Sequence, residues 1–309
     1  MTLPANFPSP AWKSFSVFGW PIQMYAICIL VGIVLAVLIT NRRLTRRGGE
    51  PWVVIDIALW AVPFGIIGAR IWHVLTHPDD YFAPGANLFK VLYIWEGGIA
   101  IFGALLAGAI GAYIGCRIAG IRFLSFADAL IPGLLIAQAM GRLGNWFNQE
   151  LFGTPTDVPW GLLIDPSNPA YPVGLPAGTL FHPMFFYEGL WNLAGVLLIL
   201  ALEHYRRYRW GRVLGVYLVW YGLGRFVFEA YRLDPSEVIL GLRSNAWAAL
   251  FALILGLIIV IVQGRRHPGD ELTVYSPGRS KPGDQPEVDS DDDGELFVDH
   301  GKGATVTLS

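Results

Sequence analysis

Side chains suited to binding an anion occur in two patterns in this sequence. Tyr221, Arg225 and Glu229 are spaced i, i+4 and i+8, so on a helix they share one face. The segment from Gly141 to Gly153 (GRLGNWFNQELFG) holds one Arg, two Asn, one Gln and one Glu. Arginine stays protonated and donates several hydrogen bonds to anions. Both patterns therefore favour a binding site for a negatively charged ligand.

Further ionisable side chains lie near the ends of hydrophobic runs, at a depth similar to these two patterns. They are Tyr25, Arg70, His73, Glu96, Arg142, Glu188 and Arg232. A charge near the centre of a bilayer costs about 2.5 to 3.5 kcal/mol, and less toward the interface. The alternative explanation is that arginines and carboxylates neutralise each other, or extend to the headgroups. Because these arginines outnumber what Glu229 can balance, the layer favours an anionic ligand.

Composition assigns the elements that carry these residues to a membrane. Of the 309 residues, 54% are hydrophobic and 15% are charged, and the mean hydropathy is +0.47. Soluble domains contain about 45 to 50% apolar residues. Seven runs are long enough to cross about 30 Å of hydrocarbon: roughly Pro21 to Thr40, Pro51 to Leu75, Val91 to Cys116, Phe123 to Met140, Met184 to Glu203, Val213 to Tyr231 and Asn245 to Gln263. We expect an all-α polytopic membrane protein with seven transmembrane helices.

The distribution of basic residues predicts the orientation of these helices. One side collects Arg42, Arg43, Arg46, Arg47, Arg117, Arg122, Arg206, Arg207, Arg209, Arg212, Arg265 and Arg266. The other side collects only Lys13, Lys90, Arg142, Arg232 and Arg243. Cytoplasmic loops carry an excess of Lys and Arg. The N-terminus is therefore expected outside, as a signal anchor without a cleavable signal peptide, and the C-terminus in the cytoplasm.

Two segments differ in composition from the predicted membrane domain, residues 1–263. Residues 141–182 are rich in Pro and Gly and predict an irregular extracytoplasmic cap. Residues 264–309 hold ten acidic and five basic residues, with an acidic stretch at 289–293. Such a composition buries too little apolar surface to offset the entropy of ordering. We therefore expect a disordered, dispensable cytoplasmic tail.

Several other classes of function are disfavoured. No Lys- or Arg-rich stripe with interleaved aromatic residues points to nucleic acid. The two cysteines, Cys28 and Cys116, lie in separate apolar runs and suggest neither a disulfide framework nor a metal site. No His, Cys, Asp or Glu cluster has the spacing of metal ligands, so no metal and no cofactor is expected.

The polar segments resemble those of a known family. The segment GRLGNWFNQELFG at 141–153 is similar to the signature of the bacterial phosphatidylglycerol:prolipoprotein diacylglyceryl transferases. Further segments agree in order: Tyr25, Gly68-Ala69-Arg70, His182-Pro183 with Tyr187-Glu188, and Tyr221-Gly222 with Arg225, Glu229 and Arg232. The resemblance covers roughly Phe15 to Val262. One position departs from many relatives, because Phe102 stands where they carry a histidine, seven residues after Trp95.

The resemblance implies a multi-pass enzyme of the bacterial inner (plasma) membrane. Its partners would be phosphatidylglycerol and preprolipoprotein signal peptides with a lipobox cysteine. It would transfer the diacylglyceryl group to the cysteine thiol, form a thioether and release glycerol phosphate, which is the first step of lipoprotein maturation. The positions expected to matter by resemblance are Tyr25, Arg142, Asn145, Glu150, Gly153, Arg225 and Glu229.

Roles follow from combining this reaction with the residue types. Arg142 and Arg225 would clamp the phosphate leaving group, with Arg70 and Arg232 as weaker candidates. Asn145 and Tyr25 would orient headgroup hydroxyls, and Gly153, His182 and Tyr221 complete the expected substrate contacts. A free thiol is only a few per cent thiolate at neutral pH, so a base is required. With phenylalanine at position 102, Glu150 is the first candidate base and Glu229 the second.

Two other functions remain open on the sequence alone. An anion or lipid transporter would also place arginines in a membrane cavity, but midplane sites in repeated halves would be expected there. A structural or lipid-binding scaffold would tolerate substitution of Arg142 or Glu150. Gathering of polar groups toward one leaflet under a single cap favours the enzyme.

Overall fold

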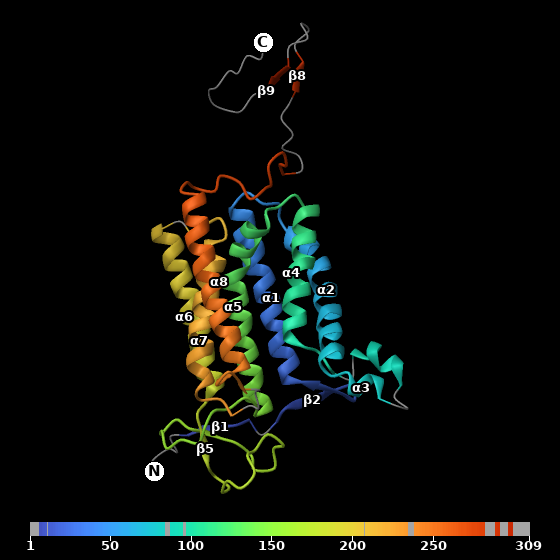
Figure 1. Cartoon of the computed structure of the whole chain (residues 1–309), viewed down its shortest axis with the longest axis vertical. Coiled ribbons are helices and arrows are strands. Elements are labelled where there is room, and N and C mark those ends of the chain that lie inside the picture. Colours follow the sequence, from blue (N-terminus) through green and yellow to red (C-terminus); the bar gives the residue numbers. More distant parts are fainter. Residues whose placement is uncertain are drawn as a thin grey trace. The chain divides into compact units, whose positions relative to one another are not determined.

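The structure is a computed structural model that describes residues 6–10, 12–83, 87–94, 97–206, 208–233, 238–281, 288–290 and 296–298 (Figure 1). Trp95, Glu96 and Arg207 of the predicted patterns, and most of the acidic stretch, lie outside these residues. The chain forms two compact units. Unit 1 comprises Met1–Leu44 and Phe123–Leu272, and unit 2 comprises Thr45–Arg122 and Thr273–Ser309. Each unit is described by itself below.

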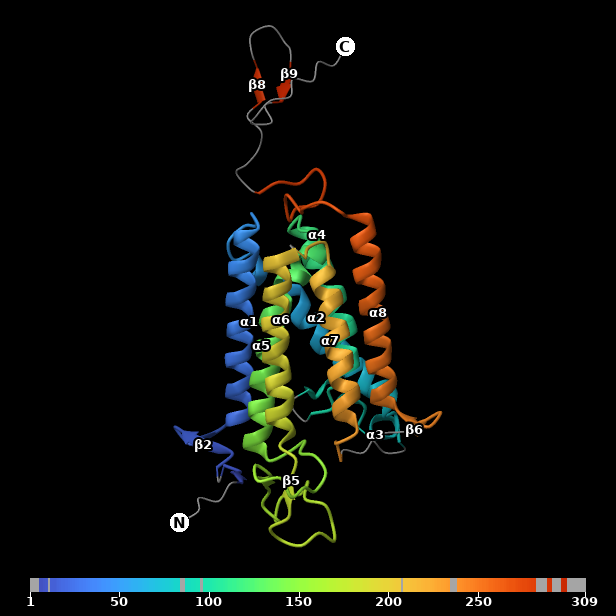
Figure 2. The ribbon, with the colours of Figure 1, turned by 90° about the vertical axis from the view of Figure 1, so that its left-hand side faces the viewer.

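Unit 1 is a bundle of long helices. They are α1 (Met24–Arg46), which ends just beyond the unit boundary, α5 (Phe123–Asn148), α6 (Met184–Arg206), α7 (Arg212–Glu229) and α8 (Ser244–Arg266). Helices α7 and α8 run side by side (Figure 2), and Gly215 allows it, because a Cβ there would lie 2.9 Å from the carbonyl oxygen of Gly256. Helices α6 and α7 are joined by Trp191 and Trp220, whose rings stack at 4.0 Å. Small residues such as Gly215 let helix backbones approach closely, and this packing takes the place of the hydrophobic driving force that helices lack in lipid.

A small irregular domain follows α5 in unit 1. It contains a three-stranded sheet of β1 (Phe7–Pro8), β4 (Leu162–Leu163) and β5 (Leu180–Phe181), in which β1 pairs in parallel with β4 and β4 antiparallel with β5. Its own core consists of Phe152, Leu162, Ile164 and Phe181. Two hairpins lead into helices: β2 (Ser14–Val17) and β3 (Trp20–Gln23) precede α1, and β6 (Val238–Ile239) and β7 (Leu242–Arg243) precede α8.

Unit 2 is built on the pair α2 (Val53–Thr76) and α4 (Ile101–Ile118), connected through α3 (Asp79–Phe82) and the 3₁₀ helix η1 (Leu88–Leu92). The two long helices pack backbone to backbone, because a Cβ at Gly103 would lie 2.2 Å from the carbonyl oxygen of Gly68. The tail adds the short strands β8 (Val288–Ser290) and β9 (Leu296–Val298).

Six helices of the described chain are long and apolar enough to cross a membrane: α1, α2, α4, α5, α6 and α8. The protein is therefore a mostly helical, multi-pass membrane protein. Helix α7 is not among the six, because its 18 residues include the charged side chains of Arg212, Arg225 and Glu229. It nonetheless packs against α5, α6 and α8.

Three boundaries differ from the sequence-based expectation. The third run was expected from Val91, but α4 begins at Ile101, because Gly97 and Gly98 have φ of +92° and +70° and interrupt the helix. The fourth was expected to end at Met140, but α5 continues to Asn148, so the cap begins later. The tail was expected to be disordered from residue 264, but its backbone at 274–276 pairs with the loop between α4 and α5.

Candidate active site

The last turns of α5 bring an arginine, an asparagine and a glutamate together. The Arg142 NH1 atom donates to Asn145 Oδ1 at 3.2 Å, and Asn145 Nδ2 donates to Glu150 Oε1 at 2.9 Å. Asn148 Nδ2 lies 3.3 Å from the same oxygen. The helix ends at Asn148, and the next residue, Gln149, has a φ of +54°, which turns the chain so that Glu150 folds back on the helix. Glu150 thus accepts from two amides, and no ion pair to it is found in the described part of the chain.

Glu188, near the start of α6, holds two arginines. Its Oε2 lies 2.7 Å from Arg142 Nε, and its Oε1 lies 3.1 Å from Arg232 NH1. The Glu188 and Arg232 side chains are almost fully buried, whereas 29% of the Arg142 side chain is exposed. One carboxylate therefore fixes two guanidinium groups from segments that are far apart in sequence.

A second glutamate on α7 repeats this arrangement. Glu229 Oε2 lies 3.0 Å from Arg225 NH2, and Glu229 Oε1 lies 3.1 Å from Arg243 Nε and 3.3 Å from Asn245 Nδ2. Arg243 NH1 also donates to the carbonyl oxygen of Arg232 at 2.9 Å. This last bond joins the two Arg–Glu–Arg groups into one network of α5, α6, α7 and the start of α8.

Tyr25 and Tyr221 are the two tyrosines expected at the site. The Tyr25 ring packs against α5 at Gly144, where a Cβ would lie 2.7 Å from Tyr25 Cδ2. Tyr221 lies one turn before Arg225 on α7, as the i, i+4 spacing predicted, and is 40% exposed. Its hydroxyl has no hydrogen bond among the described residues, so it can bind a ligand.

Gly153 and His182 act mainly through the backbone. Gly153 N donates to His182 O at 2.9 Å, and Gly153 forms an antiparallel bridge with Arg232. A Cβ at Gly153 would lie 2.8 Å from His182 Cβ, so a larger residue would displace this contact. The His182 ring packs against Tyr231 at 5.4 Å, and its Nδ1 lies 3.4 Å from the Tyr187 hydroxyl. Both residues therefore fix the segment that presents Arg232.

Arg70 lies in unit 2, and its donors are directed to backbone carbonyls. Nε donates to Val91 O at 2.8 Å, NH1 to Gly97 O and Gly98 O at 2.7 and 3.0 Å, and NH2 to Tyr93 O at 3.3 Å and to Lys90 O. Its guanidinium also lies 5.0 Å from the centre of the Tyr81 ring. The side chain thus organises the loop between η1 and α4.

Phe102, also in unit 2, contacts Trp72 with a ring separation of 6.3 Å. One turn of α2 beyond Arg70, His73 Nδ1 lies 3.1 Å from the Tyr81 hydroxyl, and its ring stacks on His77 at 4.4 Å. No three His, Cys, Asp or Glu side chains come together as metal ligands within the described segments.

Sequence reasoning missed the partners that hold the arginines. Glu188 was expected only as a member of the polar layer, and Arg243 and Asn245 were not expected at the site. The signal for Glu188 was available, because it is an acidic residue at the start of an apolar helix. Arg243 and Asn245 gave no comparable signal, because charges and amides are ordinary just before a membrane helix.

The network leaves several guanidinium donors available. Arg142 NH2, Arg225 Nε and Arg225 NH1 have no hydrogen-bond or ion-pair partner among the described residues. Both side chains are only partly buried. Spare donors on two arginines beside a carboxylate that is bound only by amides suit the binding of an anion next to a proton acceptor.

This chain is similar to known proteins over most of its length. Residues 13–262 match the family model described as prolipoprotein diacylglyceryl transferase. The chain is 58% identical over 292 residues to the phosphatidylglycerol--prolipoprotein diacylglyceryl transferase of Leifsonia xyli, with 92% of this chain and 87% of the relative covered. It is 44% identical to transferase 2 of Streptomyces coelicolor, covering 86% and 84% of the two chains. It is 46% identical to the transferase of Bifidobacterium longum, covering 84% and 85%. The chain therefore belongs to the prolipoprotein diacylglyceryl transferase family.

Proposed function

We propose that this transferase moves the diacylglyceryl group of phosphatidylglycerol to the lipobox cysteine thiol of a preprolipoprotein. The observation that carries the proposal is the joined Arg142–Glu188–Arg232 and Arg225–Glu229–Arg243 network, with spare donors on Arg142 and Arg225. Phosphatidylglycerol supplies the anion that these donors suit.

The reaction exchanges one bond for another. The cysteine sulfur, as a thiolate, attacks the glyceryl carbon that carries the phosphate ester. A carbon–sulfur bond forms, and the carbon–oxygen bond to phosphate breaks. The leaving glycerol phosphate takes the electron pair, and its growing negative charge is stabilised by Arg142 and Arg225. Arg232 contributes through its position beside Glu188.

Glu150 is the better of the two candidate bases. Glu229 lies within 3.1 Å of two guanidinium groups and accepts a hydrogen bond from one amide, so it is placed to hold arginines. Glu150 accepts hydrogen bonds from Asn145 and Asn148 on Oε1, and no partner of its Oε2 is found in the described chain. We assign Glu150 the removal of the thiol proton and Glu229 the positioning of Arg225.

The remaining expected contacts divide into two groups. Tyr25, Asn145 and Tyr221 would bind the headgroup hydroxyls of the lipid. Gly153 and His182 would hold the backbone around Arg232. For Arg70, whose donors meet five carbonyl oxygens, we propose a role in shaping the loop before α4 rather than direct contact with lipid.

The membrane arrangement completes the proposal. Helix α7 would be a seventh transmembrane helix, packed against α5, α6 and α8. The N-terminus would lie outside, and the irregular domain after α5 would cap the site at the outer surface of the bacterial inner membrane. Residues 264–309 would lie in the cytoplasm.

The direct test is product formation by the purified protein. The enzyme is incubated with phosphatidylglycerol and a lipobox peptide, and the peptide is analysed by mass spectrometry for a thioether-linked diacylglyceryl group. A peptide with serine in place of the cysteine is the matched control and should gain no mass. Failure to modify the cysteine peptide, by a protein shown to be folded, would refute the proposed activity.

A further inference from the structure

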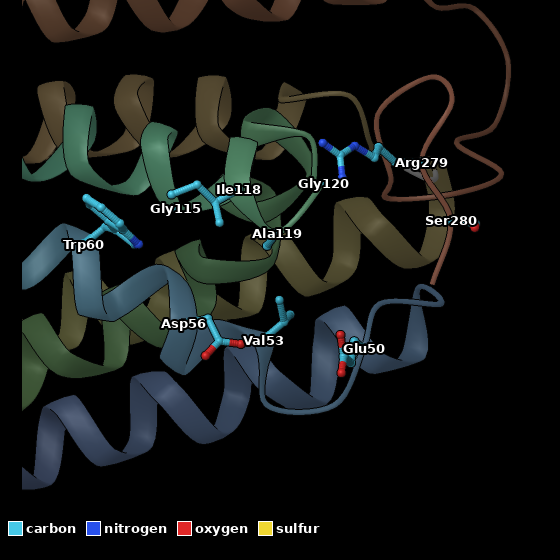
Figure 3. Close-up of a pocket in the computed structure, with 10 residues that line it drawn as sticks. All are labelled: Glu50, Val53, Asp56, Trp60, Gly115, Ile118, Ala119, Gly120, Arg279 and Ser280. Atoms are coloured by element: carbon cyan, nitrogen blue, oxygen red, sulfur yellow. The ribbon is translucent and has the colours of Figure 1, made fainter. Parts of the chain in front are cut away.

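A pocket of about 290 Å³ lies in unit 2, where α2 begins and α4 ends (Figure 3). This is the end of unit 2 remote from Arg70, which lies in the last two turns of α2. The pocket is bounded by the first turns of α2, by the end of α4 and by the tail residues Arg279 and Ser280. The tail therefore builds one wall of it.

The tail segment is held firmly in this position. Val274 O accepts from Arg122 N at 2.8 Å, and Ser276 N donates to Gly120 O at 2.8 Å. The Tyr275 side chain is only 4% exposed, and its hydroxyl accepts from Glu50 N at 3.0 Å. The segment is thus joined to the loops on both sides of the pocket.

A tight turn then directs Arg279 over the end of α4. Arg279 N donates to Ser276 O at 3.0 Å, and Gly278 within the turn has a φ of +74°, which glycine adopts without strain. Gly120 makes room for the arginine, because a Cβ there would lie 3.3 Å from Arg279 Cβ. The guanidinium group is therefore placed by ordered backbone on one side of the pocket.

Opposite charges face each other across the pocket. Glu50 and Asp56 lie on the side of α2, and Arg279 lies on the side of the tail (Figure 3). None of these three side chains forms an ion pair or side-chain hydrogen bond within the described chain. The end of α4 adds a partial negative charge from its last carbonyl groups. A ligand with a cation and an anion a few bonds apart would satisfy both walls.

The surroundings place the pocket at the edge of the membrane. Trp60 and Ile118, which line it, are 40% and 59% exposed, and the neighbouring surfaces of α2 and α4 are apolar. Tryptophan is enriched at the boundary between hydrocarbon and water. A lipid whose chains lie along α2 and α4 would present its headgroup at this level.

We propose that this pocket binds the zwitterionic headgroup of an aminophospholipid, with the ammonium group at Glu50 and Asp56 and the phosphate at Arg279. The site lies in a unit separate from the arginine network and takes a different headgroup charge. The proposal does not depend on the proposed catalytic activity. It also gives the first part of the tail a role, as the wall that carries Arg279.

The test measures lipid binding to the full chain in detergent by native mass spectrometry. Phosphatidylethanolamine should bind about tenfold more tightly than phosphatidylcholine, whose quaternary ammonium has no N–H donors. Arg279→Gln and Asp56→Asn should each weaken phosphatidylethanolamine binding about tenfold. Lys281→Gln and Asp79→Asn, which remove the same charges outside the pocket, should leave it unchanged. Maleimide labelling of buried Cys116 verifies that each variant keeps unit 2 folded.

Soluble phosphoethanolamine distinguishes a lipid from a free ligand. If it displaces the lipid, the headgroup alone is recognised; if it does not, while Arg279→Gln still weakens binding, the acyl chains contribute and the ligand is the whole lipid. Equal affinity of the wild-type protein and both pocket variants would overturn the proposal. Phosphatidylglycerol binding as tightly as phosphatidylethanolamine, without any effect of Asp56→Asn, would also overturn it, because only an anion would then be recognised.

Discussion

The two ends of the unit 1 bundle both contain buried arginine–glutamate pairs, but the arginines are bonded differently. At the Glu203 end, Arg43 NH2 donates to both Glu203 oxygens at 2.7 and 2.8 Å, and Arg43 Nε donates to Ala129 O at 3.0 Å. Arg209 NH1 adds a third contact to Glu203 at 3.3 Å. These bonds connect α1, α5 and α6, and they occupy both oxygens of the carboxylate.

The same end contains a fully buried aspartate that serves a helix. Asp128 Oδ2 accepts from Gly211 N at 2.8 Å, and Asp128 Oδ1 accepts from Leu214 N at 2.9 Å. Gly211 is the residue before α7 and Leu214 lies in its first turn, and this helix has no side-chain cap of its own. A carboxylate from α5 therefore satisfies amide groups that would otherwise be buried without partners.

The Arg142 end has similar residues but spare donors. Glu188 and Glu229 each hold two arginines, yet Arg142 and Arg225 retain N–H groups without partners in the described chain. The comparison teaches that a buried arginine does not by itself mark a site. An arginine that only connects helices has its N–H donors occupied by neighbouring carboxylates and carbonyls, whereas an arginine in a binding site keeps N–H donors without protein partners.

The largest expected effect is the loss of activity in Arg142→Gln. Removing a guanidinium that stabilises the leaving phosphate should lower kcat/KM about 10³-fold. The fold should survive, because Glu188 keeps its ion pair with Arg232. Transfer is measured with the lipobox peptide, and folding is measured by the temperature at which buried Cys28 reacts with maleimide. Wild-type activity in this variant would remove Arg142 from the clamp.

The opposite result is expected at the other end for Arg43→Gln. Breaking a largely buried ion pair should lower the free energy of unfolding by about 3 kcal/mol. Activity per folded molecule should stay within about twofold of wild type, because this end contributes no donor to the reaction. Cys28 labelling and transfer are measured on the same samples. A fall in activity without a fall in stability would contradict the division between the two ends.

Glu150→Gln tests the proton acceptor within the Arg142 end. Gln keeps an oxygen that accepts from Asn145 but cannot take up the thiol proton, so kcat should fall about 10²-fold. The KM for phosphatidylglycerol should change little. Unchanged turnover at neutral pH would exclude Glu150 as the base.

The main features of the fold and of the α7 face could be predicted from sequence. Apolar runs locate helices reliably, and the i, i+4 spacing correctly placed Arg225 beside Glu229. The extension of α5 to Asn148 was not predicted, because polar residues at 141–148 read as a loop when hydropathy alone defines the helix. The late start of α4 depends on positive φ at Gly97 and Gly98, which two glycines permit but do not require.

The partners within the site were harder to predict than its arginines. Sequence spacing relates residues on one helix, whereas Glu188 meets Arg142 and Arg232 across three segments. For Arg70 the difficulty is different. An arginine at this depth suggested contact with a ligand, whereas its N–H groups donate to backbone carbonyl oxygens. The expectation for the tail came from its average composition, which does not single out Val274 and Tyr275, two buried residues in its first part.

The smallest expected effect concerns Asp165, in the cap beyond the Arg142 end. Its carboxylate accepts from Ser167 N and Ser167 Oγ, both at 2.8 Å, and these bonds lower the pKa of Asp165 below its usual value. A lowered pKa in the folded state means that the carboxylate stabilises this turn above the ordinary pKa of an aspartate. That contribution is lost as the pH falls through the lowered value.

Hydrogen exchange at the Ser167 amide, corrected for the intrinsic rate, measures this turn directly. In the wild-type protein, protection should decrease as the pH falls below about 4. In Asp165→Asn, which keeps an oxygen acceptor but cannot titrate, protection should not change over the same range, and in Asp165→Ala it should be low throughout. Transfer activity should be within about twofold of wild type in both variants, because the exposed Asp165 and Ser167 side chains contribute to neither charge network. A large loss of activity in either variant would instead show that this turn of the cap contributes to the function of the Arg142 end.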